Sequence, residues 1–106
     1  MKILFIITAS IAIKKCDDIF KELTKKNIKI DCIITDNAKK MINLRKLQKN
    51  ISGDIFDNNS EINNKMLHIK LTRKSDIIVV CPATANIIAK FANGYADDLA
   101  STSLIA

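Results

Sequence analysis

The spacing of hydrophobic positions changes several times along this chain, and each change marks a predicted element. Residues 2–8 (KILFIIT) form an unbroken run of branched apolar residues, which is typical of a strand covered on both faces. From Ser10 the apolar residues recur at helical spacing, with Lys, Asp and Glu between them. Residues 28–35 (IKIDCIIT) alternate and then become fully apolar, so they predict a second strand. Helical spacing returns over residues 36–50.

The second half of the chain continues this alternation after a polar stretch. Residues 51–65 (ISGDIFDNNSEINNK) are rich in Asn, Asp and Ser and predict a loop. Residues 66–74 predict a short helix or turn. They lead into residues 76–82 (DIIVVCP), an apolar run that a proline stops, as in a central parallel strand. Helical spacing resumes over residues 88–92 and again after Asp97.

This order of strands and helices predicts an α/β fold in which helices cover both faces of a parallel sheet. Ligands in such folds bind beyond the carboxyl ends of the strands. That rule selects three short polar turns, each of which opens a predicted helix: residues 8–10 (TAS), 35–37 (TDN) and 81–86 (CPATAN). We expect these three turns to lie together at one edge of the sheet.

Length and charge narrow the class of protein. With 106 residues the chain predicts a single domain, and its hydrophobic fraction of 48% and charged fraction of 26% are ordinary for a globular protein. The net charge of +6 is spread over single and paired lysines, without a basic block carrying interleaved aromatics. We therefore interpret it as a solvated surface and expect no nucleic-acid partner. An RNA-binding or acidic-ligand domain stays open as the alternative.

Cysteines and the amino-terminal run bear on compartment and membrane. Cys16, Cys32 and Cys81 are odd in number and form no CxxC pair, so they indicate neither a disulfide framework nor a metal site. Buried thiols fit a reducing cytoplasm. The first thirteen residues resemble a signal peptide only superficially, because one charge precedes an apolar run too short to span a bilayer. We expect a buried first strand and no membrane association.

The three turns carry the candidate ligand contacts. The first lacks both GxGxxG and GxxxxGK[ST], which argues against the usual dinucleotide site and a P-loop. Ser10 stands at a helix start, where it serves either as a helix cap or beside a phosphate. Thr35 and Asp36 follow the second strand in the same layer, and on their own they are most simply a helix cap. Thr84 and Asn86 form either a plain capped turn or a pair able to hydrogen-bond the edge of a heterocycle.

Two further features have competing interpretations. His68 is the only histidine, and a lone histidine is usually a surface or satisfied core residue, although this one precedes a strand whose end carries the third turn. Asp97 and Asp98 are adjacent carboxylates that suit either acid–base chemistry or the start of a helix. Acidic residues favour that end of a helix, so the cap is the better hypothesis.

Several motifs together resemble a known family. TASIAIKK near the start, HIKLTRKSDIIVVCPATANIIAKFANGYADDL later, and the spacing between them resemble the homo-oligomeric flavin-containing cysteine decarboxylases. The resemblance is greatest to the flavoprotein part of phosphopantothenoylcysteine decarboxylase, an enzyme of coenzyme A biosynthesis. It runs from residue 2 to residue 106 and implies a Rossmann-like, flavodoxin-like fold that is C-terminally truncated relative to the family.

The resemblance also implies roles for individual residues and an FMN cofactor. By position, Ser10 and Ile11 are implied to contact the phosphate side of FMN. Thr35 is implied to be a second flavin contact, and the run Thr84, Ala85 and Asn86 to line the flavin ring or ribityl chain. His68 is the implied catalytic histidine, close to flavin and substrate at a subunit boundary.

The implied reaction is the FMN-dependent decarboxylation of 4'-phosphopantothenoylcysteine to 4'-phosphopantetheine. FMN oxidises the cysteinyl thiol, carbon dioxide leaves, and the enethiol is reduced again by the same flavin. The family forms trimers and larger assemblies of trimers, such as dodecamers, with FMN at the subunit contact. We therefore expect a cytoplasmic homo-oligomer whose substrate is a small molecule, and no metal site.

Departures from the family pattern qualify this expectation. Ala9 replaces a glycine beside the implied phosphate contact, and Ile87 replaces a threonine. The P-x-M-N-x-x-M segment that grips the substrate in the family, and its flap cysteine, have no counterpart in these 106 residues. One hypothesis is a shortened or split decarboxylase whose second polypeptide supplies the rest. The alternative is an FMN-binding or oligomerising remnant without activity. A flavin prenyltransferase shares the fold, but the ATAN turn argues against it.

Overall fold

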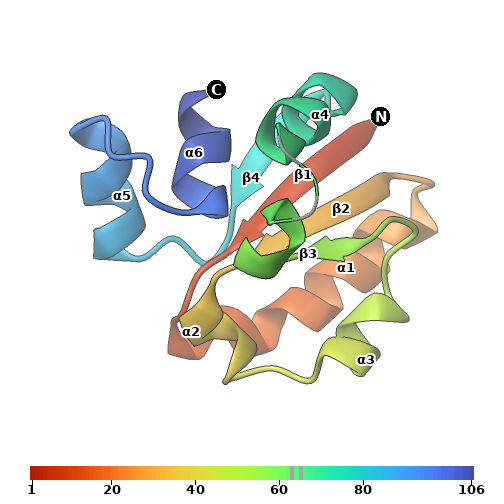
Figure 1. Cartoon of the computed structure of the whole chain (residues 1–106). Coiled ribbons are helices and arrows are strands. Elements are labelled where there is room, and N and C mark those ends of the chain that lie inside the picture. The colour runs from red at the N-terminus through yellow and green to blue at the C-terminus, as the bar shows by residue number, and fades with distance from the viewer. Residues whose placement is uncertain (63, 65) are drawn as a thin grey trace.

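The computed structural model describes residues 1–62, 64 and 66–106, and its helices and strands alternate along the chain (Figure 1). The strands are β1 (Lys2–Ile7), β2 (Lys29–Ile34), β3 (Ile55–Phe56) and β4 (Ile77–Val80). The α-helices are α1 (Cys16–Lys25), α2 (Asp36–Lys39), α3 (Leu44–Gln48), α4 (Leu67–Lys74), α5 (Ala85–Ala92) and α6 (Leu99–Ile105). Two 3₁₀ helices, η1 (Ile11–Lys15) and η2 (Asn58–Glu61), complete the order.

All described strand pairs are parallel, and the sheet has the order β3-β2-β1-β4. β1 pairs with β2 over six residues, from Lys2 opposite Lys29 to Ile7 opposite Ile34. Because the strands are parallel, their carboxyl ends meet at one edge of the sheet, where the turns that follow β1, β2 and β4 come together.

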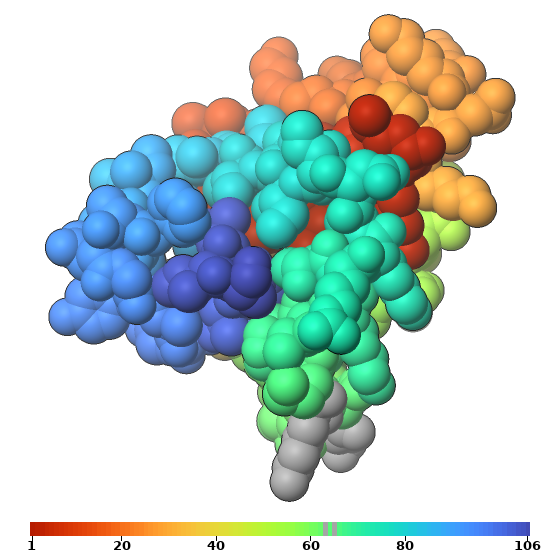
Figure 2. All heavy atoms as spheres, turned by 90° about the horizontal axis from the view of Figure 1, so that it is seen from above, coloured from red at the N-terminus to blue at the C-terminus, as the bar shows by residue number. Residues whose placement is uncertain are grey.

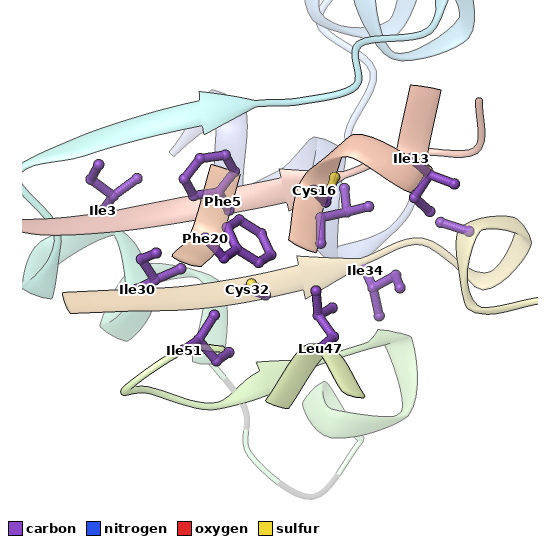
Figure 3. Packing of buried hydrophobic residues seen from close by; sticks show 12 residues of the cluster. Ile3, Phe5, Ile13, Cys16, Phe20, Ile30, Cys32, Ile34, Leu47 and Ile51 are labelled. Atoms are coloured by element: carbon purple, nitrogen blue, oxygen red, sulfur yellow. The ribbon is translucent and has the colours of Figure 1, made fainter. Parts of the chain in front are cut away.

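Helices cover both faces of this sheet, as the continuous apolar runs of β1 and β2 predict. On one face Phe5 of β1 packs edge-on against Phe20 of α1, with ring centroids 4.8 Å apart (Figure 3). On the other face Leu4 and Ile6 of β1 pack with residues of α4 and α6. Figure 2 shows α6 between α5 and α4 at the surface of that layer. The expected three-layer α/β fold is confirmed.

The helix predicted over residues 36–50 is wrong as one element. The chain forms α2 and α3 instead, and Asn43 between them has extended backbone. Its side chain accepts a hydrogen bond from the Lys46 N–H at 3.2 Å. An Asn that caps a new helix start competes with continuation of the preceding helix, which explains the break.

The predicted loop over residues 51–65 contains two elements that sequence periodicity did not show. β3 adds a short parallel strand to the sheet, with Cys32 opposite Ile55, and η2 follows it. Gly53 permits this approach, because a Cβ there would stand 2.0 Å from Asp31 Oδ1 and 2.4 Å from the Ile30 carbonyl oxygen. The rest of that prediction includes residues 63 and 65, which lie outside the described residues.

The third predicted strand was expected in the centre of the sheet, and this placement is wrong for the described chain. β4 lies at an edge, and Ile77 at its start is 48% exposed. A continuous apolar run reports burial beneath helices on both faces, and it does not report a hydrogen-bonded neighbour on each side. β1 and β2 are the central strands. The predicted helices over residues 66–74, 88–92 and after Asp97 are confirmed as α4, α5 and α6.

The described helices are short. The longest, α1, has ten residues, and none of the helices in the described part of the chain is long and apolar enough to cross a membrane.

Candidate functional site

The turns after β1, β2 and β4 enclose a cavity of ≈ 470 Å³ at the carboxyl edge of the sheet. This volume falls in the range of about 300–1,000 Å³ that is usual for small-molecule sites. The lining residues come from all three turns and from η2, α5 and the start of α6: Thr8, Ala9, Thr35, Asp36, Asn37, Asn58, Thr84, Asn86, Ile87, Lys90 and Asp98. The expected convergence of the three turns is therefore confirmed.

A buried hydroxyl fixes two of the turns relative to each other. Thr8, which is 3% exposed, donates a hydrogen bond to the carbonyl oxygen of Pro82. The same Oγ1 accepts from the backbone N–H of Thr84 at 3.2 Å. Thr8 thus joins the end of β1 to the turn after β4, and its two bonds set the position at which α5 begins.

Two further hydroxyls begin helices at the cavity. Thr35 Oγ1 accepts from the Ala38 N–H, and Thr84 Oγ1 accepts from the Ile87 N–H, each at 3.3 Å. Both residues are therefore helix caps and cavity-lining residues at once. A hydroxyl that accepts from a backbone N–H keeps its own proton, so each can still donate to a ligand.

Two side-chain amides supply the remaining polar surface. Asn37 and Asn86 line the cavity, and neither amide forms a hydrogen bond with another residue that the structure describes. An amide offers a donor and an acceptor side by side, which matches the alternating groups along the edge of a heterocycle. The arrangement suits a planar polar ligand better than a simple ion.

The lysine at the cavity pairs with two carboxylates. Lys90 Nζ lies 3.0 Å from Asp97 Oδ1 and 3.7 Å from Asp98 Oδ2. The hydrogen bond with Asp97 raises the pKa of the lysine, and the same bond lowers the pKa of the Asp97 carboxyl. Asp98 caps α6, because its carboxylate accepts from the Ser101 N–H at 2.8 Å. The cap hypothesis is confirmed for Asp98, while Asp97 pairs with Lys90.

Asn58 is a lining residue that sequence reasoning missed. It begins η2, which comes from the segment predicted as a loop. The sequence signal for η2 was the pair Asp57 and Ser60, which form a capping box. The Asp57 side chain accepts from the Ser60 N–H, and the Ser60 hydroxyl oxygen accepts from the Asp57 N–H. That pattern marks a helix start directly before Asn58.

Other predicted site residues lie outside the lining of this cavity. Ser10 caps η1 and accepts from the Ala12 N–H at 3.2 Å. Ile11 is 78% exposed, and Ala85 is exposed at the start of α5. Their neighbours in sequence, Ala9 and Asn86, do line it. The structure brings Thr35, Thr84 and Asn86 together and leaves Ser10, Ile11 and Ala85 beside them as predictions.

His68 also lies outside the cavity lining. It stands on α4, and its Nδ1 is 2.6 Å from Glu61 Oε1 of η2. The imidazole is half-buried, with 19% of the side chain exposed. A carboxylate at this distance fixes the orientation of the ring and the tautomer it adopts. Its catalytic role stays a prediction.

The three cysteines are free thiols that lie outside the cavity lining. Cys16 and Cys32 are buried, Cys81 is half-buried, and all three are free. Burial raises the pKa of the Cys16 thiol to about 11 and raises that of Cys32 as well, so both are protonated and unreactive at neutral pH. Among the described residues no cluster of His, Cys, Asp and Glu could hold a metal ion.

A parallel sheet covered by helices on both faces, with a polar cavity beyond its strand ends, has the architecture of the flavodoxin-like folds. The model of the flavoprotein family matches residues 1–106, and the chain belongs to that family. A flavin, the cofactor expected from the sequence, is the cofactor that gives the family its name.

The sequence is similar to proteins that are named for coenzyme A biosynthesis or for phosphopantothenoylcysteine decarboxylation. The chain is 34% identical over 104 residues to the coenzyme A biosynthesis bifunctional protein CoaBC of Methanocaldococcus jannaschii, covering 98% of this chain and 25% of the relative. It is 30% identical over 107 residues to a probable phosphopantothenoylcysteine decarboxylase of Streptococcus mutans, covering 99% and 60%. The chain thus spans a quarter of one relative and three fifths of the other.

Solved structures share the fold. The FMN-dependent cysteine decarboxylase TvaF of thioviridamide biosynthesis superposes with a TM-score of 0.91 at 19% identity, over 99% of this chain and 66% of that one. The peptidyl-cysteine decarboxylase EpiD superposes with a TM-score of 0.82 at 32% identity, over 96% and 61%. The expected flavodoxin-like fold is confirmed by these neighbours.

Proposed function

We propose that this chain binds FMN in the cavity at the carboxyl edge of its sheet. The observation that carries the proposal is the convergence of the three strand-end turns, which places the hydroxyls of Thr35 and Thr84 and the amides of Asn37 and Asn86 around one space. Membership of the flavoprotein family and the FMN-dependent neighbour support it.

The proposal assigns each side of the cavity to a part of FMN. Asn86, with Thr84 and Ala85, stands on the ring or ribityl side, and Thr35 provides a second contact. Ser10 and Ile11 lie outside the lining, next to Ala9 at the start of η1, and are proposed for the phosphate side. Lys90 is already paired with two carboxylates, so the phosphate is held by backbone N–H groups and hydroxyls.

We further propose that the chain is the flavoprotein part of a phosphopantothenoylcysteine decarboxylase in coenzyme A biosynthesis. The names of the CoaBC and Streptococcus mutans relatives support this substrate. When bound, FMN supplies a two-electron acceptor that makes loss of carbon dioxide easier. The protein's share of the chemistry is to orient the flavin edge through Asn86 and to move a proton at the imidazole of His68.

The assembly belongs to the same proposal. His68 lies on α4 with Glu61 beside it, outside the cavity of its own chain. A homotrimer or dodecamer in the cytoplasm would bring this histidine to a neighbouring cavity. The substrate clamp comes from polypeptide that these 106 residues do not contain, either in the same protein or in a second one. For the 106 residues alone we expect FMN binding without decarboxylation.

The test compares Asn86 of α5 with Asn93, the residue that follows the last residue of that helix and whose side chain donates to the Ala89 carbonyl. Asn86→Ala removes an amide that lines the cavity, whereas Asn93→Ala makes the same change at the other end of the helix, outside the lining. We expect the first variant to weaken FMN binding about tenfold and the second to leave it unchanged, because only the first loses a ligand contact. Equal affinities would remove Asn86 from the site. Carbon dioxide release from phosphopantothenoylcysteine by the chain alone would show that no outside clamp is required.

A further inference from the structure

The 3₁₀ helix η2 connects two walls of the cavity through one side chain. Asn58 Nδ2 donates to Asp36 Oδ2 of α2 at 3.1 Å, and Asn58 Oδ1 accepts from the backbone N–H of Leu99 in α6 at 3.0 Å. Asp36 is 22 residues away in sequence and Leu99 is 41 residues away. Both hydrogen bonds lie beside the cavity, because Asn58, Asp36 and Asp98 belong to its lining.

A carboxamide can form both bonds at once, because it carries a donor and an acceptor. The first requires a donor, because Asp36 is an acceptor when ionised, and the second requires an acceptor for an N–H. Leu99 is 1% exposed, and its N–H belongs to the first turn of α6, where backbone donors have no partner within the helix. The Asp98 cap accepts from the Ser101 N–H, so Asn58 satisfies a donor that the cap does not reach.

The backbone that carries Asn58 is held in place by other contacts. Asp57 caps η2 through the Ser60 N–H at 3.1 Å, and its other oxygen lies 2.7 Å from Lys39 Nζ of α2. η2 is thus attached to α2 by an ion pair next to the Asn58 bond. The carboxamide is therefore presented to the cavity by a short element with its own anchors, and it does not support that element alone.

We propose that Asn58 is a positioning residue for the cofactor: it sets the spacing between the wall of Asp36 and Asn37 and the wall at the start of α6. The inference rests on the proposed binding of FMN in this cavity. Loss of the Asp36–Asn58–Leu99 connection lets the two walls separate, which weakens FMN binding while the core between β1, β2 and their helices stays intact.

The test uses the full chain and a charge exchange. Asn58→Asp keeps the acceptor for Leu99 but sets a carboxylate against Asp36, and we expect FMN affinity at pH 7 to fall about three- to tenfold. The double variant Asp36→Asn/Asn58→Asp restores a donor facing an acceptor with the order reversed, so its affinity returns to within about twofold of wild type. Asn59→Asp adds the same charge to an exposed neighbour in η2 and is the matched control.

The outcomes separate the two proposals. If wild-type protein binds FMN and Asn58→Asp binds it equally well, or if the double variant is no better than Asn58→Asp, the positioning role is overturned. It is also overturned if Asn58→Asp lowers the thermal midpoint of the cofactor-free chain far more than Asn59→Asp does, because the loss would then be one of folding. Failure of wild-type protein to bind FMN overturns the proposed function itself.

Discussion

The backbone N–H of Thr84 donates a hydrogen bond of 3.2 Å to Thr8 Oγ1, across a sequence separation of 76 residues. The bond joins the end of the central strand β1 to the turn after the edge strand β4. The same Thr8 hydroxyl also donates a hydrogen bond to the carbonyl oxygen of Pro82. One buried side chain therefore holds two of the three turns on which the cavity depends.

Replacement of Thr8 by valine tests this connection. The shape is retained, but the half-buried Thr84 N–H and the carbonyl of buried Pro82 lose their partner. We therefore expect a loss of about 1–3 kcal/mol in the free energy of unfolding and weaker FMN binding. Denaturant unfolding measures the first effect and FMN titration the second.

Thr24→Val is the control for that experiment. Thr24 is exposed, and its hydroxyl donates to the Asn50 carbonyl at 2.8 Å, away from the cavity. We expect a smaller loss of stability and unchanged FMN affinity. If both threonine variants weakened FMN binding to the same degree, the role given to Thr8 would be wrong.

Replacing each of the two glycines by alanine should destabilise the protein for a different reason. At Gly53 a Cβ would overlap Asp31 Oδ1 and the Ile30 carbonyl oxygen, so Gly53→Ala must shift β3 away from β2 and cost about 1–3 kcal/mol. At Gly94 there is open space but a φ of +71°, so Gly94→Ala costs about 1–2 kcal/mol through backbone strain alone. Only the first change should weaken FMN binding, because β3 leads into η2 and Asn58. Amide exchange across β3 reports the shift directly, and unchanged protection in Gly53→Ala would contradict it.

The ion pair between Asp57 and Lys39 predicts a pH dependence. The hydrogen bond from Lys39 holds the pKa of the Asp57 carboxyl below its usual 3.8, and the same bond raises the pKa of Lys39 above its usual 10.5. A lowered carboxyl pKa contributes stability above about pH 4 that is lost as the pH falls through the folded-state value. A raised lysine pKa contributes stability below about pH 10.5 that is lost as the pH rises further.

Lys39→Gln isolates that contribution. The variant should unfold more easily than wild type between about pH 4 and pH 10, and the difference should disappear in stronger acid, where Asp57 is protonated. Lys40→Gln, at an exposed neighbouring position, should show no such pH-dependent difference. A gap between Lys39→Gln and wild type that persisted unchanged at pH 2 would contradict the role given to the pair.

The core predicts a large effect at Phe20. This side chain is fully buried against Phe5, so Phe20→Ala should cost about 3–5 kcal/mol through lost contacts and a cavity. Phe91→Ala, the same change at a residue that is 57% exposed, should cost far less. Thermal or denaturant unfolding measures both, and similar losses in the two variants would place the core elsewhere.

The parts of this structure that were predictable from sequence are those that depend on local pattern. The apolar runs of β1 and β2 reflect burial under helices on both faces, and that burial follows from period alone. The meeting of Thr35, Thr84 and Asn86 follows from a general property of parallel sheets, which brings the carboxyl ends of their strands to one edge.

The missed features depend on contacts between distant residues. β3 has only two residues, and the chain beside it is joined to β2 by backbone hydrogen bonds such as Cys32 N–H to the Asp54 carbonyl at 2.9 Å. Such bonds produce no periodic pattern in the sequence. Asn58 belongs to a polar segment typical of a loop, and its partners lie far along the chain. The edge position of β4 depends on which strands pair with it, and apolar runs carry no such information.

Titration of the purified chain with FMN tests the central claim most directly. We predict saturable binding of one FMN per chain, quenching of flavin fluorescence, and retention of a yellow chromophore absorbing near ~450 nm after removal of free cofactor. Binding should be weakened by Asn86→Ala and unaffected by Asn93→Ala. A folded, colourless chain that takes up no added FMN would contradict the account.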